Sequence, residues 1–227
     1  MNASIRQHAE ARLSRRTPYW KVKKSPVLLS TDEFTVVRDA LPAFWHRHAD
    51  FLALGAARLN ETAAVFVCDV DPDTAGCEIS KTWMPTRDGW KIRPNKYGRR
   101  VIRVPEALID SLDLDRPGDE LLFTTRSGGA VLGHRYAQVW RRALADLLDG
   151  HDESSDPLHG KRPRPQDVRW SCAEWLLSAG ASLPSVVAYL GLARIDTLVP
   201  LIERCVPELG AKLTGVTPVV SSPPVSP

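Results

Sequence analysis

The chain has 227 residues, of which 43% are hydrophobic, and a formal net charge of +3. A chain of this length and composition can bury one good core, which fits one globular domain with irregular ends. Its N-terminus has no apolar segment, and the longest uncharged apolar run, 51–57, is far shorter than the ~20 residues that cross a bilayer. We therefore expect no membrane partner and a cytoplasmic location.

The cysteines and histidines form no motif for a metal or for disulfides. No Cys-x-x-Cys pair is present, and His151 and His159 are too isolated to be argued as ligands. We expect reduced thiols in the core, no metal and no cofactor. The four cysteines are Cys68, Cys77, Cys172 and Cys205.

Positive charge is confined to particular segments. Residues 1–24 carry seven Lys or Arg against Glu10, and residues 81–104 carry eight against Asp88. Residues 25–80 instead carry nine acids against three arginines. This distribution is typical of a protein that docks on a polyanion, and charges that serve only solubility are the alternative.

The two ends of the chain differ in composition from the middle. Residues 1–24 are basic and cannot form a core, so we expect a basic N-terminal arm or linker, or else a plain disordered leader. Residues 214–227 are rich in Pro, Ser and Val and predict a disordered tail. The folded domain is expected over 25–213.

Two helices are predicted after the arm. Residues 30–33 read Ser-Thr-Asp-Glu, a capping signature that predicts a helix to Leu41. Pro42 begins a second predicted helix, which ends at Gly55. Its apolar face contains Phe44, His48, Phe51 and Leu52.

The segment 56–61 follows and reads Ala-Ala-Arg-Leu-Asn-Glu. Its arginine, Arg58, is either a phosphate ligand or the partner of Glu61 in an i,i+3 ion pair. The residues alone do not decide between the two.

A small antiparallel sheet is predicted next. Strand-like patterns occur at 65–70, 76–83, 90–93 and 99–104 and are separated by turn residues. The last two would form a basic hairpin over 93–100, whose tip is either solvated or faces a polyanion. The basic residues near this tip are Lys96, Arg99 and Arg100.

Two more helices are predicted in the middle of the chain. One starts at Pro105, and the other covers 134–148. The core face of the second contains Tyr136, Trp140 and Leu144. Its arginines lie on other faces, where they could line DNA; they are Arg135, Arg141 and Arg142.

The stretch 163–201 reads as three short helices separated by Gly180, Pro184 and Gly191. Arg169 opens the first of them. A cation fixed at a helix N-terminus is typical of a phosphate site, whereas a surface or salt-bridge arginine is the plain alternative. The approach to this helix is basic and contains Lys161, Arg162 and Arg164.

This stretch resembles the second half of the catalytic domain of tyrosine recombinases (phage integrases). The family box His-x-x-Arg-His reads here Gln166-Asp-Val-Arg169-Trp, and the later Ala-Gly and Leu-Gly turns are kept at Gly180 and Gly191. The first family box, Thr-Gly-Leu-Arg-x-Gly-Glu, is matched at Arg58 and Glu61. The resemblance covers roughly residues 27–209.

The resemblance implies an α+β, mainly α fold with a small antiparallel sheet and a basic hairpin. It also implies that Arg58 and Arg169 bind a DNA phosphate. The lysine with which the family protonates the leaving 5′ oxygen is matched best by Lys96, with Lys91 second.

The other catalytic positions depart from the family pattern. Gln166 stands where the family has histidine or lysine, Leu192 where it has histidine or tryptophan, and Leu201 where it has the nucleophilic tyrosine. Neither glutamine nor leucine can transfer a proton or attack a phosphate at neutral pH. No residue is therefore a confident catalytic residue, and Tyr189 is a weak candidate for a displaced nucleophile.

We predict a catalytically silent, recombinase-like protein that binds double-stranded DNA in the nucleoid and assists recombination of a mobile element. Its partner could be a recombinase or a second copy of the chain. One alternative is an active recombinase that uses Tyr189, Tyr97 or a tyrosine of its partner. The other is a protein-interaction module that has kept only the fold, with Arg58 and Arg169 in structural ion pairs.

Overall fold

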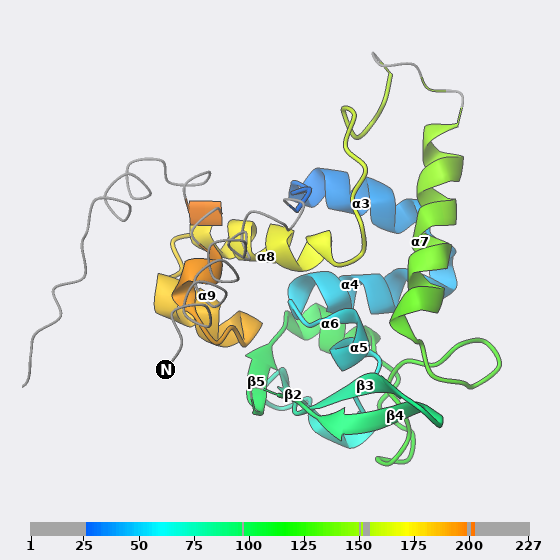
Figure 1. The fold of residues 1–227 in the computed structure, drawn as a ribbon, viewed down its shortest axis with the longest axis vertical. Coiled ribbons are helices and arrows are strands. Elements are labelled where there is room, and N and C mark those ends of the chain that lie inside the picture. Colours follow the sequence, from blue (N-terminus) through cyan, green and yellow to red (C-terminus); the bar gives the residue numbers. More distant parts are fainter. Residues whose placement is uncertain (1–25, 97, 150, 152–154, 199–200, 203–227) are drawn as a thin grey trace, which may run out of the picture.

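The computed structural model of the chain describes residues 26–96, 98–149, 151, 155–198 and 201–202. The arm predicted over 1–24, the tail predicted over 214–227 and Tyr97 lie outside these ranges. In Figure 1, α3, α4, α7 and α8 lie in the upper part of the molecule, and the strands lie at the lower end. Helix α9 lies beside β5 and packs on it.

Helices predominate among the described residues, and the strands are short. The α-helices are α3 (Thr31–Ala40), α4 (His46–Leu54), α5 (Leu59–Thr62), α6 (Glu106–Ser111), α7 (Gly133–Leu148), α8 (Asp167–Ser178) and α9 (Leu183–Leu190). Single 3₁₀ turns are η1 (Ala43–Trp45), η2 (Val67–Asp69) and η3 (Ile195–Leu198). The strands are β1 (Val70–Asp71), β2 (Gly76–Ile79), β3 (Lys81–Thr86), β4 (Gly89–Pro94) and β5 (Arg100–Arg103). The predicted α+β, mainly α fold is confirmed.

The N-terminal helices follow the sequence signals closely. The Ser30 side chain accepts a hydrogen bond from the Glu33 backbone N–H, and the Glu33 carboxylate accepts one from the Ser30 N–H, so the predicted capping box is present. In α4, the predicted core residues from His48 to Leu52 are buried. The placement of Phe44 on that face is wrong: the side chain is 42% exposed because it lies in η1, outside the register of α4.

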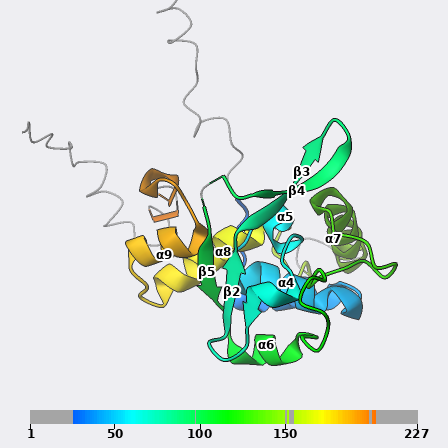
Figure 2. The same ribbon diagram turned by 90° about the horizontal axis from the view of Figure 1, so that it is seen from below.

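The strands pair differently from the prediction. β5 pairs with β2, which also pairs with β1, while β3 and β4 form a separate hairpin. The predicted hairpin over 93–100 is therefore wrong. The turn between β3 and β4 lies at Arg87 and Asp88, just before Gly89, which has a positive φ of 105°. Asn95 continues the pairing by donating its backbone N–H to the Ser80 carbonyl, and the next turn follows where Gly98 N–H bonds to the Asn95 carbonyl. Figure 2 shows the β3–β4 hairpin projecting from the body of the molecule.

Two hydrophobic clusters fill the interior. The larger one joins α3, α4, α7 and the strands and contains Phe51, Tyr136 and Trp140, which confirms the predicted core face of α7. The smaller one joins α8 and α9, and Leu201 packs in it. Its apolar residues come also from the segment before α3 and from the turn after α4.

Three smaller features differ from the sequence analysis. Pro184 does not separate two helices but lies in the first turn of α9, where Ser182 caps the helix. Asp167, not Arg169, is the first residue of α8. Cys68 is exposed, whereas Cys77 and Cys172 are buried thiols as predicted. Within the described ranges, no helix is both long and apolar enough to cross a bilayer.

Candidate phosphate site

Arg58 is positioned by the sharp turn between α4 and α5. Ala56, which is buried, adopts a positive φ of 45° and redirects the chain so that Arg58 becomes the residue before α5. Glu61, in the first turn of α5, accepts bonds from the Arg58 backbone N–H (3.0 Å) and from its Nη1 (2.6 Å). The ion pair that the sequence left open is therefore formed, and 41% of the Arg58 side chain stays exposed.

Arg100 approaches the same carboxylate from β5. Its Nη2 donates to Oε2 of Glu61 at 2.8 Å, and its Nε donates to the Tyr189 carbonyl at 3.0 Å. Its side chain packs over Gly191, where a Cβ would lie 2.9 Å from both Cδ and Nη1 of Arg100. Only 12% of the side chain is exposed, so this guanidinium is held in one orientation.

Arg169 lies behind these two arginines, on the third residue of α8. Its Nη1 donates to the Ala56 carbonyl and its Nη2 to the Leu190 carbonyl, and only 5% of the residue is exposed. The guanidinium thus ties α8 to the turn before α5 and to the end of α9. Arg58 and Arg169 are 111 positions apart in the sequence. The fold brings them together because Arg169 bonds to the carbonyl of Ala56, two residues before Arg58.

The electrostatics confirm that the charges are close together. Burial, then Arg58 and more weakly Arg100, lower the pKa of Arg169 to about 9 against the attraction of Glu61, so Arg169 stays charged at neutral pH. Burial acts to raise the pKa of Glu61, but bonds from Arg100 and Arg58 outweigh it and the pKa falls below its usual value. Three guanidinium groups and one carboxylate leave a net charge of two positive units.

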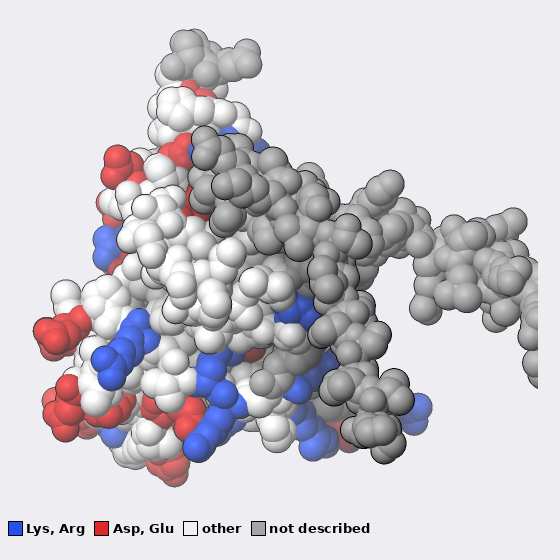
Figure 3. Space-filling view, turned by 90° about the vertical axis from the view of Figure 1, so that its left-hand side faces the viewer, with Lys and Arg blue, Asp and Glu red and all other residues white. Residues whose placement is uncertain are grey.

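Such a cluster has the chemistry of an anion site. A guanidinium presents its N–H groups in a planar fork that matches two oxygens of a phosphate, which a lysine ammonium does not. On the face that carries α9 and β5, Figure 3 shows Lys and Arg side chains gathered toward the end of the molecule that holds the strands.

Other predicted basic residues are placed elsewhere. The basic approach to α8 is paired with acids: Lys161 with Glu33 at 2.6 Å, Arg162 with Asp156 at 2.9 Å, and Arg164 with Asp167 at 2.7 Å. Asp167, the first residue of α8, is almost fully buried. Arg164 is therefore engaged in a local ion pair with the start of this helix. The remaining predicted ligands lie exposed on the turn after β4, beside β5 and on α7; they are Lys96, Arg99 and Arg135.

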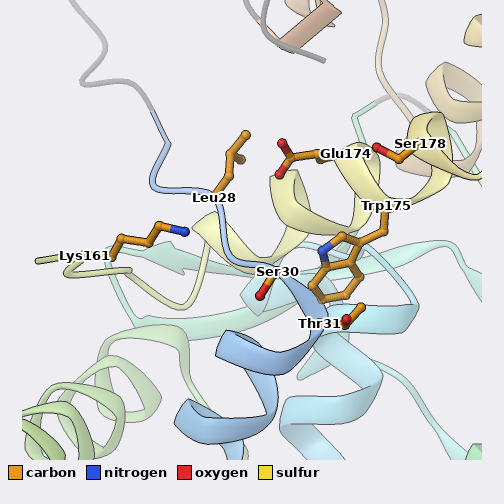
Figure 4. A pocket seen from close by; sticks show the side chains of 7 residues that line it. All are labelled: Leu28, Ser30, Thr31, Lys161, Glu174, Trp175 and Ser178. Atoms are coloured by element: carbon orange, nitrogen blue, oxygen red, sulfur yellow. The ribbon is translucent and has the colours of Figure 1, made fainter. Parts of the chain in front are cut away.

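A shallow hollow of about 350 Å³ lies between the start of α3 and α8 (Figure 4). Trp175 and Lys161 line it. Both carboxylate oxygens of Glu33 lie 2.6 Å from Nζ of Lys161. Because this cation is already neutralised, the hollow lacks the surplus charge of the arginine cluster.

The positions expected to hold catalytic groups do not supply them. Gln166 is exposed just before α8, Leu192 is half-buried after α9, and Leu201 is buried in the smaller cluster. The Tyr189 hydroxyl lies between two backbone carbonyls, 2.7 Å from that of Leu54 and 2.6 Å from that of Arg103. It donates its one hydrogen to either of them.

The environment of Tyr189 also disfavours a nucleophilic role. Burial raises the pKa of its phenol well above the usual value, so the phenolate is even scarcer at neutral pH than for a free tyrosine. Among the described residues, no group of three or more His, Cys, Asp or Glu could hold a metal ion.

Sequence reasoning missed that Arg100 belongs to the cluster and placed it at a hairpin tip instead. A signal was present, because side chains alternate along a strand. Ile102 is buried and Val101 exposed, so Arg100 shares the inward face with Ile102, while Arg99 and Arg103 point outward.

Comparison with known proteins finds similarity in structure. No protein-family model matches the sequence, and no curated protein matches it either. The Tn1549 transposon integrase, solved with a circular intermediate DNA, aligns over 86% of this chain and 67% of its own, with a TM-score of 0.67 and 15% identity.

Two further solved structures give the same result. XerA recombinase aligns over 87% of this chain and 68% of its own, with a TM-score of 0.59 and 17% identity. The catalytic domain of bacteriophage HP1 integrase aligns over 87% of this chain and 98% of its own, with a TM-score of 0.55 and 12% identity. The chain therefore has the fold of the catalytic domain of tyrosine recombinases and integrases, as its sequence motifs predicted.

Proposed function

We propose that this chain binds double-stranded DNA by holding a backbone phosphate at Arg58 and Arg169, and that it acts in DNA recombination without cutting the strand. The observation that carries the proposal is that Arg58 and Arg100 pair with one buried carboxylate while Arg169 lies close enough to share their field, which leaves a surplus of positive charge. Arg58 is the more exposed ligand, and Arg169 supplies charge from behind it.

The solved neighbours support DNA as the anion. The Tn1549 integrase is described in complexes with a circular intermediate and with transposon right end DNA, and XerH with its difH substrate. Phosphate contacts give affinity that is independent of sequence and falls steeply with salt. The proposed place of action is the nucleoid in the cytoplasm, with a recombinase or a second copy of the chain as partner.

The absence of cleavage rests on the residues at the expected catalytic positions. Transfer of a phosphoryl group to a protein needs a nucleophile and groups that move protons. Gln166, Leu192 and Leu201 provide neither, and Tyr189 is held by backbone carbonyls. The guanidinium groups stay protonated, so they stabilise charge but transfer no proton.

A second candidate is a protein-interaction module on the same fold. It is favoured by one observation: Arg169 is almost fully buried and already donates to two carbonyls, as a purely structural arginine would. This candidate predicts that the chain binds no duplex even at low salt.

Fluorescence anisotropy with a labelled duplex of random sequence, at about 50 and 200 mM salt, tests the proposal. Arg58→Ala leaves Glu61 paired with Arg100 and should weaken binding roughly tenfold or more at low salt. The matched control is Arg38→Ala, which removes an arginine of α3 that is paired with Asp50 of α4 and should change binding less than about twofold. Equal effects of the two variants would contradict the proposed site.

Cleavage is tested separately by incubating the wild-type chain with nicked duplex and looking for a covalent adduct that survives denaturation. We expect none. An adduct that disappears in Tyr189→Phe would show that the chain is an active recombinase.

A further inference from the structure

Arg100 is held more firmly than a lone surface arginine on a strand. One side of its guanidinium donates to the Tyr189 carbonyl and to Glu61, and its stem packs on Gly191. Its neighbour Arg99 is 79% exposed and lies 3.5 Å from Glu78. The two adjacent arginines therefore carry the same charge in very different surroundings.

Arg100 also keeps donors available. Among the described residues its Nε and Nη2 have hydrogen-bond partners, whereas its Nη1 donates to none. A guanidinium has five N–H groups, so the two on Nη1, which lies over Gly191, a residue without a side chain, remain for a ligand. The bonds on the other side fix their direction in advance, which lowers the entropy lost on binding.

Arg100 and Arg58 flank the same carboxylate. Arg58 bonds to Oε1 of Glu61 and Arg100 to Oε2. Glu61 is buried, so it acts as a fixed spacer that sets the separation of the two guanidinium groups. It also offsets their mutual repulsion, which would otherwise push them apart.

We propose that Arg100 is a third phosphate ligand, which donates from Nη1 to a non-bridging oxygen of the same DNA phosphodiester that Arg58 contacts. This inference rests on the proposed function. It assigns to β5 a cation in the site, so that the phosphate is held by arginines from three separate segments. Arginine binds the phosphate without acting as an acid or base, which suits a clamp that does not cut.

The competing interpretation is that Arg100 only ties β5 to α9 through the Tyr189 carbonyl. In that case, replacing Arg100 would lower the stability of the protein. It would weaken DNA binding only as much as the loss of any one nearby positive charge does. Arg99 provides the comparison, because it lies one residue away with the opposite orientation.

Two matched pairs of variants separate the interpretations by anisotropy with the same labelled duplex. Arg100→Lys and Arg99→Lys both keep the positive charge. Only Arg100→Lys removes a guanidinium group that is proposed to bond to Glu61, to the Tyr189 carbonyl and to a phosphate at the same time. We expect Arg100→Lys to weaken binding about tenfold and Arg99→Lys less than twofold. Thermal melting of each variant sets an assay temperature at which all are folded.

The second pair, Arg100→Met and Arg99→Met, removes one charge each and keeps an apolar stem over Gly191. A further loss of affinity for Arg100→Met relative to Arg99→Met supports the inference. If wild type and Arg58→Ala behave as proposed but neither pair shows a difference, Arg100 is not a ligand and the proposed function stands. If the wild type binds no duplex, the proposed function itself fails.

Discussion

The two hydrophobic clusters are held together by different forces. The larger cluster packs aromatic rings among aliphatic side chains, and His48 lies within it with its ring centre 4.3 Å from that of Tyr136. Neither ring nitrogen of His48 nor the Tyr136 hydroxyl has a partner among the described residues. Around these two rings the cluster is stabilised by apolar packing, although Trp140 nearby donates its Nε1–H to the Pro163 carbonyl at 2.8 Å.

The smaller cluster is joined to the larger by side chains that bond to backbone carbonyls. Arg169 reaches Ala56 and Leu190 within the smaller cluster, whereas Trp175 reaches Leu29 of the larger cluster at 2.8 Å, and Tyr189 reaches the carbonyls at the end of α4 and in β5. The arginine cluster lies at this junction. The candidate site therefore depends on how α8 and α9 are docked.

The largest effect is expected from Arg169→Ala, which breaks the junction. Two buried carbonyls lose their donor and a cavity remains, so the free energy of unfolding should fall by about 4 kcal/mol. Arg99→Ala, which removes an exposed arginine 3.5 Å from the partly exposed Glu78, should cost about 0.5 kcal/mol or less. Urea unfolding measures both. Similar losses for the two variants would mean that Arg169 does not hold the junction.

The larger cluster should instead be sensitive to pH through His48. Burial lowers the pKa of His48 to about 3, while the unfolded chain has an ordinary histidine pKa of about 6.5. Between these values the unfolded state binds more protons, so stability falls as the pH decreases. At pH 5 the loss should be about 2 kcal/mol relative to neutral pH.

Urea unfolding of wild type and His48→Leu from pH 7 to pH 5 measures this difference. The variant should show a much flatter profile over this range, because the acids with lowered pKa values, such as Glu61, titrate at lower pH. An unchanged slope in His48→Leu would assign the pH dependence to other groups.

A smaller effect is expected from Gly191→Ala, which tests how the junction positions Arg100. Gly191 has a φ of 60°, and a Cβ there would lie 2.9 Å from Cδ of Arg100. We expect a loss of about 1.5 kcal/mol in stability together with weaker DNA binding. Gly180→Ala is the control, since Gly180 has a φ of 87° with no atom within 4 Å of an added Cβ. It should lower stability and leave binding unchanged.

The smallest effect is expected from Tyr189→Phe, which removes one donor from the junction and should cost about 1 kcal/mol. Tyr136→Phe in the larger cluster removes a hydroxyl that has no partner and should be neutral or stabilising. Chemical denaturation distinguishes the two. A greater loss for Tyr136→Phe would reverse the contrast between the clusters.

Local signals predicted the parts of the fold that depend on neighbours in the sequence. The capping box at Ser30 and the core stripe of α7 with Trp140 are of this kind, since each is decided within a few turns of chain. Strand pairing was predicted wrongly, because the partner of β5 is β2 and not its neighbour β4. A hairpin pattern carries no information on such a partner.

The candidate site was predicted in part for the same reason. The motif placed Arg58 and Arg169, but it did not show that Lys161 is neutralised by Glu33, 128 positions away. It also did not show that Arg169 is buried against two carbonyls or that Arg100 shares Glu61. These are tertiary contacts, which depend on the docking of α8 and α9.

The central claim, that a DNA phosphate binds at the arginine cluster, is tested most directly by NMR of the arginine side chains. The Nε–Hε resonances of the wild-type protein would be followed during titration with a short duplex at low salt. The account predicts large shifts for Arg58 and Arg100, smaller ones for Arg169, and none for Arg38 on α3. Shifts confined to arginines outside the cluster, with Arg58 and Arg100 unchanged, would contradict it.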